Sequence, residues 1–354
     1  MERFRDVLTA LRGRIPHSLL AGEGWDRLLE RVGDLPAAAA CSLCGFEFRL
    51  DEPAPAADFS NPVSKGRVAR HYIARGEAAA PESVEAWLAA HLKDASATDH
   101  WLESVLPAYD IIAPPSPIPP TIYLRLRPGG EKGGIAAGPE EVARTVAKAC
   151  ARNDSEPERR ALARALGALP AGARLAYVAA TPNLAPRSVR LLAADIGARE
   201  LGPLLKRLQW PGSTAAVDGL LAGMADLCGR FLLLCDINED GALPRLGFEM
   251  HAVRGNAANY RALLAAWLTT SKSDWRPVIR RLVDLGWCLP AKAEGLLAWP
   301  GLRTVLGEAG AFQLYMGINH VKLSVDEGGV RAKAYGGLRL LPLDQFAKES
   351  FFGG

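Results

Sequence analysis

Apolar and polar residues alternate along several short stretches of this chain. Cys44–Leu50 and Ile122–Arg127 repeat with a period of two, which is typical of β-strands with one apolar face. Residues that favour turns separate these stretches, such as Asp326–Gly329. The pattern predicts five strand pairs, which are 44–50 with 66–70, 109–112 with 122–127, 173–178 with 188–193, 231–237 with 246–251, and 314–325 with 330–335.

The segments between the strand pairs have helical spacing of apolar residues or start signals for helices. The chain begins with an amphipathic pattern, and a helix starting near Pro81 is expected to continue to Leu106. Further helices are predicted over 139–153, 155–168, 198–208, 213–227, 256–269, 274–285 and 291–298. The chain therefore divides into five units of two strands with helices, roughly 1–75, 76–135, 136–195, 196–252 and 253–340.

Short sequence echoes accompany these units. Gly-Phe-Glu occurs at 45–47 and 247–249, and Trp-Pro-Gly occurs at 210–212 and 299–301. Duplication and chance both explain matches of this length. Strands joined as hairpins form antiparallel sheets, and ten of them either close or leave two edges. We expect an α+β fold with a single domain over 1–354, a ten-stranded antiparallel barrel inside a ring of helices; the alternative is an open sheet with its polar face in water.

Alternate residues of the predicted strands place polar side chains on one shared face. The expected members of this face are Gly45, Glu47 and Arg49; Tyr123, Arg125 and Arg127; Gly247, Glu249 and His251; Ile318, His320, Lys322 and Ser324; and Arg331, Lys333 and Tyr335. The opposite faces are apolar. A barrel with the polar face inside would hold arginine and lysine around an anionic ligand through charge-assisted hydrogen bonds.

Composition excludes several classes of protein. The chain has 354 residues, 49% of them hydrophobic, and a formal net charge of +3, which argues against a nucleic-acid partner. No apolar run approaches 18 residues, so no membrane span is expected, and the N-terminus lacks the apolar core of a signal peptide. The six cysteines lie mostly among apolar neighbours, as reduced thiols do. We expect a cytoplasmic monomer.

Two motifs are weighed against simpler interpretations. Asp236–Gly241 matches the start of a calcium-binding EF-hand loop, but Gly247 stands where a bidentate glutamate is needed, so a hairpin turn is favoured. Cys41 and Cys44 form a lone Cys-x-x-Cys without a second pair, so strand packing is favoured over metal or redox chemistry. No metal site is predicted.

Three short matches point to a known family. Ala332-Lys333-Ala334-Tyr335 follows His320-Val321-Lys322, Ser188-Val189-Arg190 offers a serine and a basic residue on one strand, and Gly45-Phe46-Glu47 lies on the first strand. With the five predicted units, the chain resembles the ABBA aromatic prenyltransferases over most of its length. The matched residues are similar to those of the dimethylallyltryptophan synthase and cyanobactin peptide prenyltransferase branches.

The resemblance implies transfer of an allylic prenyl group from a prenyl diphosphate to an aromatic small molecule or a peptide side chain, in natural-product (RiPP) biosynthesis. Glu47 would accept the proton, with Glu249 as an alternative base. The expected diphosphate-binding residues are Arg125, Arg190, Lys322 and Lys333, and the residues expected to shield the cation are Tyr123, Tyr177 and Tyr335. No cofactor is required, although Mg²⁺ is compatible.

Two other functions stay open at this point. The basic strand face could belong to a non-catalytic protein that binds a peptide or partner in a peptide-modification pathway, or to an enzyme of another class with the same barrel. Geometry separates these alternatives. Prenyl transfer requires Arg190, Lys322 and Lys333 to converge near Glu47 inside a closed barrel, whereas basic residues spread over an outer face would contradict it.

Overall fold

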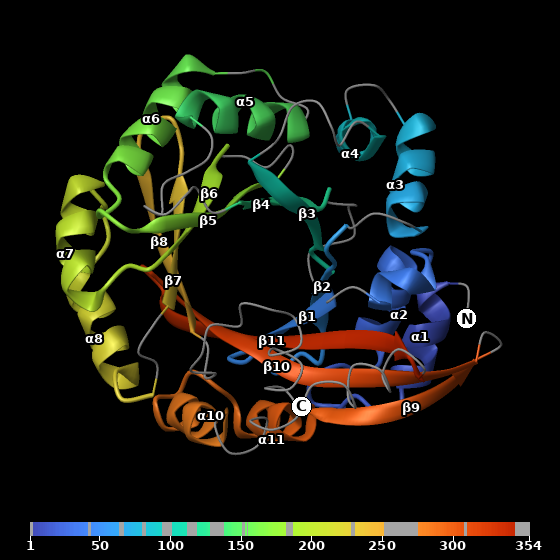
Figure 1. Ribbon diagram of the computed structural model, residues 1–354. Helices are drawn as coiled ribbons and strands as arrows, with labels where there is room; N and C mark the ends of the chain where they lie inside the picture. Colours follow the sequence, from blue (N-terminus) through green and yellow to red (C-terminus); the bar gives the residue numbers. More distant parts are fainter. Residues whose placement is uncertain are drawn as a thin grey trace, which may run out of the picture.

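The strands of the protein close into one barrel, and its helices lie outside the ring of strands (Figure 1). This computed structural model describes residues 3–41, 44–63, 67–79, 83–93, 101–111, 119–127, 138–150, 153, 155–181, 187–227, 231–250, 275–307 and 310–343.

Eight strands follow one another around the barrel in chain order. Each one hydrogen-bonds antiparallel to the next. They are β1 (Cys44–Arg49), β2 (Ala57–Ser60), β3 (Leu102–Tyr109), β4 (Thr121–Leu126), β5 (Arg174–Ala180), β6 (Val189–Ala194), β7 (Phe231–Ile237) and β8 (Ala242–Met250). Among the described residues, the connections within the pairs β1–β2, β3–β4, β5–β6 and β7–β8 contain no helix, as antiparallel neighbours allow, whereas two helices lie between each of these pairs and the next.

A long hairpin closes the barrel. It consists of β10 (Gly310–Asp326) and β11 (Gly329–Pro342). The second half of β10 pairs with β8, and β11 pairs with β1, so ten antiparallel strands form a complete ring. The predicted ten-stranded barrel is confirmed and the open-sheet alternative is wrong. The division into five repeated units stays a prediction.

The first half of β10 extends beyond the barrel. There it pairs with β9 (Gly301–Gly307), which the sequence analysis did not predict. In Figure 1 this extension reaches away from the ring toward the N-terminal helices.

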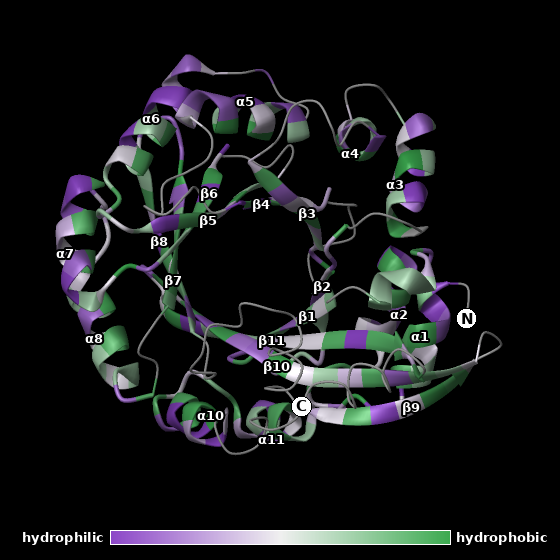
Figure 2. Ribbon diagram, in the orientation of Figure 1, coloured by the Kyte–Doolittle hydropathy of each residue, from purple (hydrophilic) through white to green (hydrophobic). Residues whose placement is uncertain are grey.

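The outer layer consists of amphipathic helices. In α10 (Trp275–Asp284) the buried residues are Trp275, Val278, Ile279 and Leu282, which is the spacing of one helical face. Figure 2 shows hydrophobic and hydrophilic residues alternating along the outer helices. The others are α1 (Phe4–Leu11), α2 (Glu23–Val32), α3 (Arg67–Glu77), α4 (Val84–Lys93), α5 (Pro139–Ala149), α6 (Glu156–Gly167), α7 (Ala198–Arg207), α8 (Thr214–Met224) and α11 (Pro290–Ala298).

The core lies between the outward faces of the strands and the helices. Phe46 and Phe48 of β1 pack edge-on against Trp299 at the end of α11, with ring centroids 5.6 and 5.4 Å apart. All three side chains are fully or almost fully buried. The apolar strand faces therefore point outward to the helices, and the polar faces point into the barrel, as the alternation predicts.

Two segments differ from the sequence prediction. The strand predicted over 66–70 is wrong, because α3 begins at Arg67 and buries Val68 and Tyr72 at helical spacing; its place in the sheet is taken by β2. The helix predicted to continue to Leu106 is also wrong. Residues 102–109 form β3, where alternate residues are buried from Val105 to Tyr109. The strand predicted over 109–112 is therefore also misplaced, because β3 ends where that strand was expected to begin.

Most other predicted helices are confirmed within a few residues of their ends, from α5 to α11. The helix predicted over 256–269, and His251 at the end of its predicted strand, lie outside the described residues. One predicted face is wrong: a bulge in β10 between Ile318 and His320 puts Ile318 on the core side, while His320 faces the interior.

The motifs that the sequence analysis set aside have structural roles. Asn238 and Gly241 exchange backbone hydrogen bonds at the β7–β8 turn, which confirms the hairpin. Cys44 is a free thiol buried in β1, as expected for strand packing. In the described part of the chain, no helix has the length and apolar character needed to cross a membrane.

Candidate active site

Polar side chains from eight strands meet inside the barrel. An eight-stranded barrel is filled by its own side chains, and a ten-stranded barrel is wider. The interior side chains keep accessible surface accordingly, with 20% exposed for Glu47 and Lys333 and 26% for Arg190. Glu47, Lys333 and Arg190 therefore remain partly accessible to solvent inside the barrel.

Glu47 is held by two neighbours on β11. It lies opposite Tyr335 in the register of β1 and β11, with Lys333 two residues before Tyr335. The Lys333 ammonium and the Tyr335 hydroxyl each donate a hydrogen bond to a different oxygen of the Glu47 carboxylate. Three residues that the sequence analysis placed on one face thus form a single cluster.

The charge of this cluster follows from its surroundings. Burial alone would raise the pKa of Glu47, but the ammonium groups of Lys333 and Lys322 and the two hydrogen bonds lower it to about 2. Burial, and then the Glu47 carboxylate, raise the pKa of Tyr335 well above its usual value. Glu47 is therefore an anion and Tyr335 a neutral donor at physiological pH.

His320 packs flat on the Tyr335 ring, with ring centroids 4.0 Å apart and planes inclined by 20°. Burial, followed by the Lys322 ammonium, lowers the pKa of His320 to about 3. His320 is therefore neutral near pH 7. Its Nε2 lies 3.7 Å from Oε1 of Glu249, and this contact is not an ion pair when the imidazole is neutral.

Arg190 is fixed by a bidentate ion pair. Its Nε and Nη2 atoms donate to the two carboxylate oxygens of Asp236 at 2.7 and 2.9 Å, and Nη1 lies 3.4 Å from the Tyr123 hydroxyl. Burial would raise the pKa of Asp236, but the Arg190 hydrogen bonds and charge lower it. The guanidinium therefore has one edge bound to Asp236 and its Nη1 directed toward Tyr123.

Asp236 was not predicted as a site residue, because it was assigned to the turn motif that follows it. The available signal was its position on the strand predicted over 231–237. There Leu234 and Asp236 share a face, and Asp236 lies opposite Arg190 in the β6–β7 register.

Lys322 differs from the other basic residues of the interior. It lies between Lys333 on β11 and Glu249 on β8 in the strand register, and only 5% of it is exposed. Within the part of the chain that the structure describes, its ammonium makes no ion pair within 4 Å and no hydrogen bond. Burial, then the charge of Arg190, lower the pKa of Lys322 to about 7.

The Lys322 side chain lies against Gly247 of the adjacent strand β8, where the absence of a side chain leaves space for it. A Cβ atom on Gly247 would lie 3.2 Å from Cε of Lys322 and 3.2 Å from Cβ of Leu234. A larger residue on β8 would therefore crowd Lys322 from the adjacent strand.

A second group of acids lies beside Glu47. Asp58 of β2 is opposite Glu47, and burial, then the Glu47 and Asp110 carboxylates, raise its pKa to about 7. Arg49 lies 3.4, 3.7 and 3.9 Å from oxygens of Glu52, Asp58 and Asp110. Arg49 is thus neutralised by carboxylates.

Arg125 and Tyr177 form a separate pair. Nε of Arg125 lies 3.3 Å from Glu103, both side chains are nearly half exposed, and the guanidinium carbon lies 5.9 Å from the Tyr177 ring centroid. Neither residue touches the Glu47 cluster in the described contacts. The structure therefore brings together Glu47, Tyr123, Arg190, Glu249, Lys322, Lys333 and Tyr335, but leaves Arg125 and Tyr177 beside them.

Two further features bear on possible ligands. Among the residues with described positions, no group of three His, Cys, Asp or Glu side chains is arranged to hold a metal ion, so nothing there marks a place for Mg²⁺.

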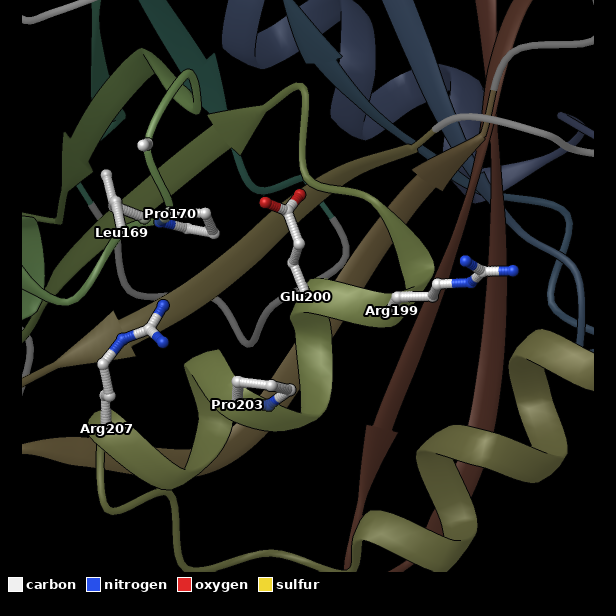
Figure 3. A pocket seen from close by; sticks show the side chains of 7 residues that line it. Leu169, Pro170, Arg199, Glu200, Pro203 and Arg207 are labelled. Carbon is white, nitrogen blue, oxygen red and sulfur yellow. The ribbon is translucent and has the colours of Figure 1, made fainter.

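A surface pocket lies outside the barrel, between α7 and the turn after α6 (Figure 3). There Arg207 donates to the carbonyl of Ala168, and Arg199 points away from the other side chains, so the pocket offers little chemistry.

Comparison with known proteins gives no assignment. No model of a protein family matches the chain, and no curated protein matches its sequence.

Proposed function

We propose that the protein is a prenyltransferase that moves an allylic prenyl group from a prenyl diphosphate to an aromatic or peptide side-chain acceptor. One observation carries the proposal: Arg190, Lys322 and Lys333, from three strands, face the same interior region as Glu47 in a closed barrel. This arrangement pairs an anion-binding surface with a carboxylate base.

The basic residues act in the first step, which is ionisation of the prenyl diphosphate. The bond between the allylic carbon and the diphosphate oxygen breaks, the electron pair leaves with the diphosphate, and an allylic cation forms. Positive groups placed in advance around the leaving oxygens stabilise this charge separation. Lys322 is the strongest candidate to contact the anion, since no carboxylate neutralises it within 4 Å among the described residues.

The tyrosine rings stabilise the allylic cation. Aromatic faces attract cations, and neutral phenols do so without reacting as phenolates. Burial raises the pKa values of Tyr123, Tyr177 and Tyr335, so all three stay neutral at physiological pH. Tyr123 and Tyr335 lie beside the Arg190 and Glu47 groups, and Tyr177 would act from the Arg125 side.

Glu47 completes the reaction by accepting the proton that the acceptor loses after it attacks the cation. In the free protein Lys333 and Lys322 make Glu47 a weak base, since they lower its pKa. A diphosphate that draws these two ammonium groups toward itself raises the proton affinity of Glu47. Donor binding would thus activate the base. Glu249, beside His320, is the alternative base.

A product assay tests this proposal. The protein is incubated with dimethylallyl or geranyl diphosphate and with tryptophan or candidate peptides, and products are followed by mass spectrometry. We expect one prenyl unit to be added to an acceptor, and Glu47→Gln to reduce turnover by about 10²-fold or more while donor binding remains. If no donor binds and no mass shift occurs with any pair, the protein is better described as a non-catalytic binding module.

A further inference from the structure

Lys322 carries a buried charge whose counter-ion is not supplied by the described protein. Its side chain is 5% exposed, and its ammonium has no hydrogen bond or ion pair in the described part of the chain. An isolated buried charge is costly unless it is paired or neutralised. An anionic ligand would provide the missing partner.

The charged and titratable groups around Lys322 come from every strand that packs near it. They are Lys333 and Tyr335 on β11, Glu249 and Arg245 on β8, Glu47 on β1, Arg190 on β6, Asp236 on β7 and His320 on β10 itself. None of the carboxylates of this set forms an ion pair within 4 Å of the Lys322 ammonium in the described contacts.

Two of these three carboxylates are hydrogen-bonded to other groups. Glu47 accepts from Lys333 and Tyr335, and Asp236 binds both edge nitrogens of Arg190. Oε1 of Glu249 lies 3.7 Å from His320. Lys322 therefore faces two cations, Arg190 and Lys333, without a carboxylate of its own.

We propose that the barrel interior binds a diphosphate group together with one proton, which Lys322 takes up from bulk solvent. The proton passes from the buffer to Nζ, and no covalent bond in the ligand changes. The choice of diphosphate rests on the proposed function; the coupling itself requires only an anion next to Lys322.

The number of protons taken up on binding depends on how far Lys322 is already protonated in the free protein. Burial, the Arg190 charge and Lys333 favour the neutral amine of Lys322, so its pKa is lowered to about 7. A bound anion favours the ammonium instead. Proton uptake on binding should therefore be small well below pH 7, where the free lysine is already charged, and should increase toward one proton well above pH 7.

Isothermal titration of the full chain with inorganic pyrophosphate measures this uptake, using two buffers of different ionisation enthalpy at each pH. Pyrophosphate also titrates in this range, so a matched variant is needed. Lys322→Arg keeps the positive charge at every pH tested, and the difference between the two proteins isolates the proton of Lys322. We expect the wild type to take up more protons than Lys322→Arg at pH 8, by up to one for each pyrophosphate bound, and the difference to shrink toward pH 6.

The outcomes separate this inference from the proposed function. Equal proton uptake by both proteins at pH 8, with pyrophosphate bound, overturns the coupling but leaves prenyl transfer standing. Absence of pyrophosphate binding to the wild type overturns both the coupling and the anion site. If Lys322→Arg does not fold, Lys322→Gln replaces it in the same subtraction. Wild-type uptake equal to that of Lys322→Gln again overturns the coupling.

Discussion

Lys322 places an ammonium group where burial and two neighbouring cations oppose its charge, and this placement costs stability. Its pKa is lower in the folded protein than the ordinary value of 10.5, so the folded state holds this proton less firmly than the unfolded state. The cost is therefore fully present below pH 7 and disappears as the pH rises through 10.5. Such a loss of stability is tolerated at a ligand site, because a bound anion stabilises the buried ammonium.

Replacing this lysine with an apolar residue of similar length should stabilise the protein. We expect Lys322→Met to raise the free energy of unfolding at pH 7 by on the order of 1–4 kcal/mol in urea titrations, with a smaller gain at pH 10. Arg125→Met, at a position nearly half exposed, is the control and should change it by less than about 0.5 kcal/mol. A loss of stability in Lys322→Met would show that its ammonium has a stabilising partner.

Single-residue placement was predictable where strands are regular. Counting alternate residues places Glu47, Lys333 and Tyr335 on one face, and the structure joins them by hydrogen bonds. Counting alternate residues places Ile318 on the wrong face, because a bulge between Ile318 and His320 reverses the alternation. The local sequence contains no pattern that indicates this bulge. The partner of Arg190 was missed since pairing depends on the register between β6 and β7, which one strand alone does not specify.

At the scale of elements, strands flanked by clear turns were predicted well, as for β7 and β8. The failures have physical causes. Residues 67–70 read Arg-Val-Ala-Arg, which is too short a stretch to distinguish a strand from the first turn of α3, and β2 is only four residues long. β9 packs along the outer part of β10, so its place depends on how far that strand extends beyond the barrel.

β11 can lie close to the end of α11 because Gly336 has no side chain. A Cβ atom on Gly336 would lie 2.8 Å from the Phe48 ring and 2.9 Å from the Trp299 ring. We expect Gly336→Ala to lower the free energy of unfolding by about 1–3 kcal/mol, because both rings are buried and must shift. Thermal or urea denaturation measures the change.

Gly45→Ala, on the adjacent strand, is the matched control. The nearest atoms to its Cβ would lie 3.7 and 3.8 Å away, which is ordinary contact. This variant should be neutral or slightly more stable, by up to about 1 kcal/mol. Equal destabilisation of both variants would contradict the packing argument and indicate a general intolerance of alanine in this sheet.

At the scale of the whole molecule, closure of the barrel creates the site. The pairing of β11 with β1 joins residues almost 290 positions apart, such as Glu47 and Tyr335. Neither the net charge of +3 nor any single strand shows this convergence. Composition argued against a nucleic-acid partner, whereas closure of the sheet brings basic groups from separate strands together on the inner face of the barrel.

The most direct test of the account is a crystal structure with dimethylallyl S-thiolodiphosphate, a donor analogue that ionises slowly. We expect the diphosphate inside the barrel, within hydrogen-bond distance of Nζ of Lys322, with Arg190 and Lys333 beside it and the prenyl chain near Tyr123 or Tyr335. A diphosphate bound only on an outer surface, or an interior without the analogue at saturating concentration, would contradict it.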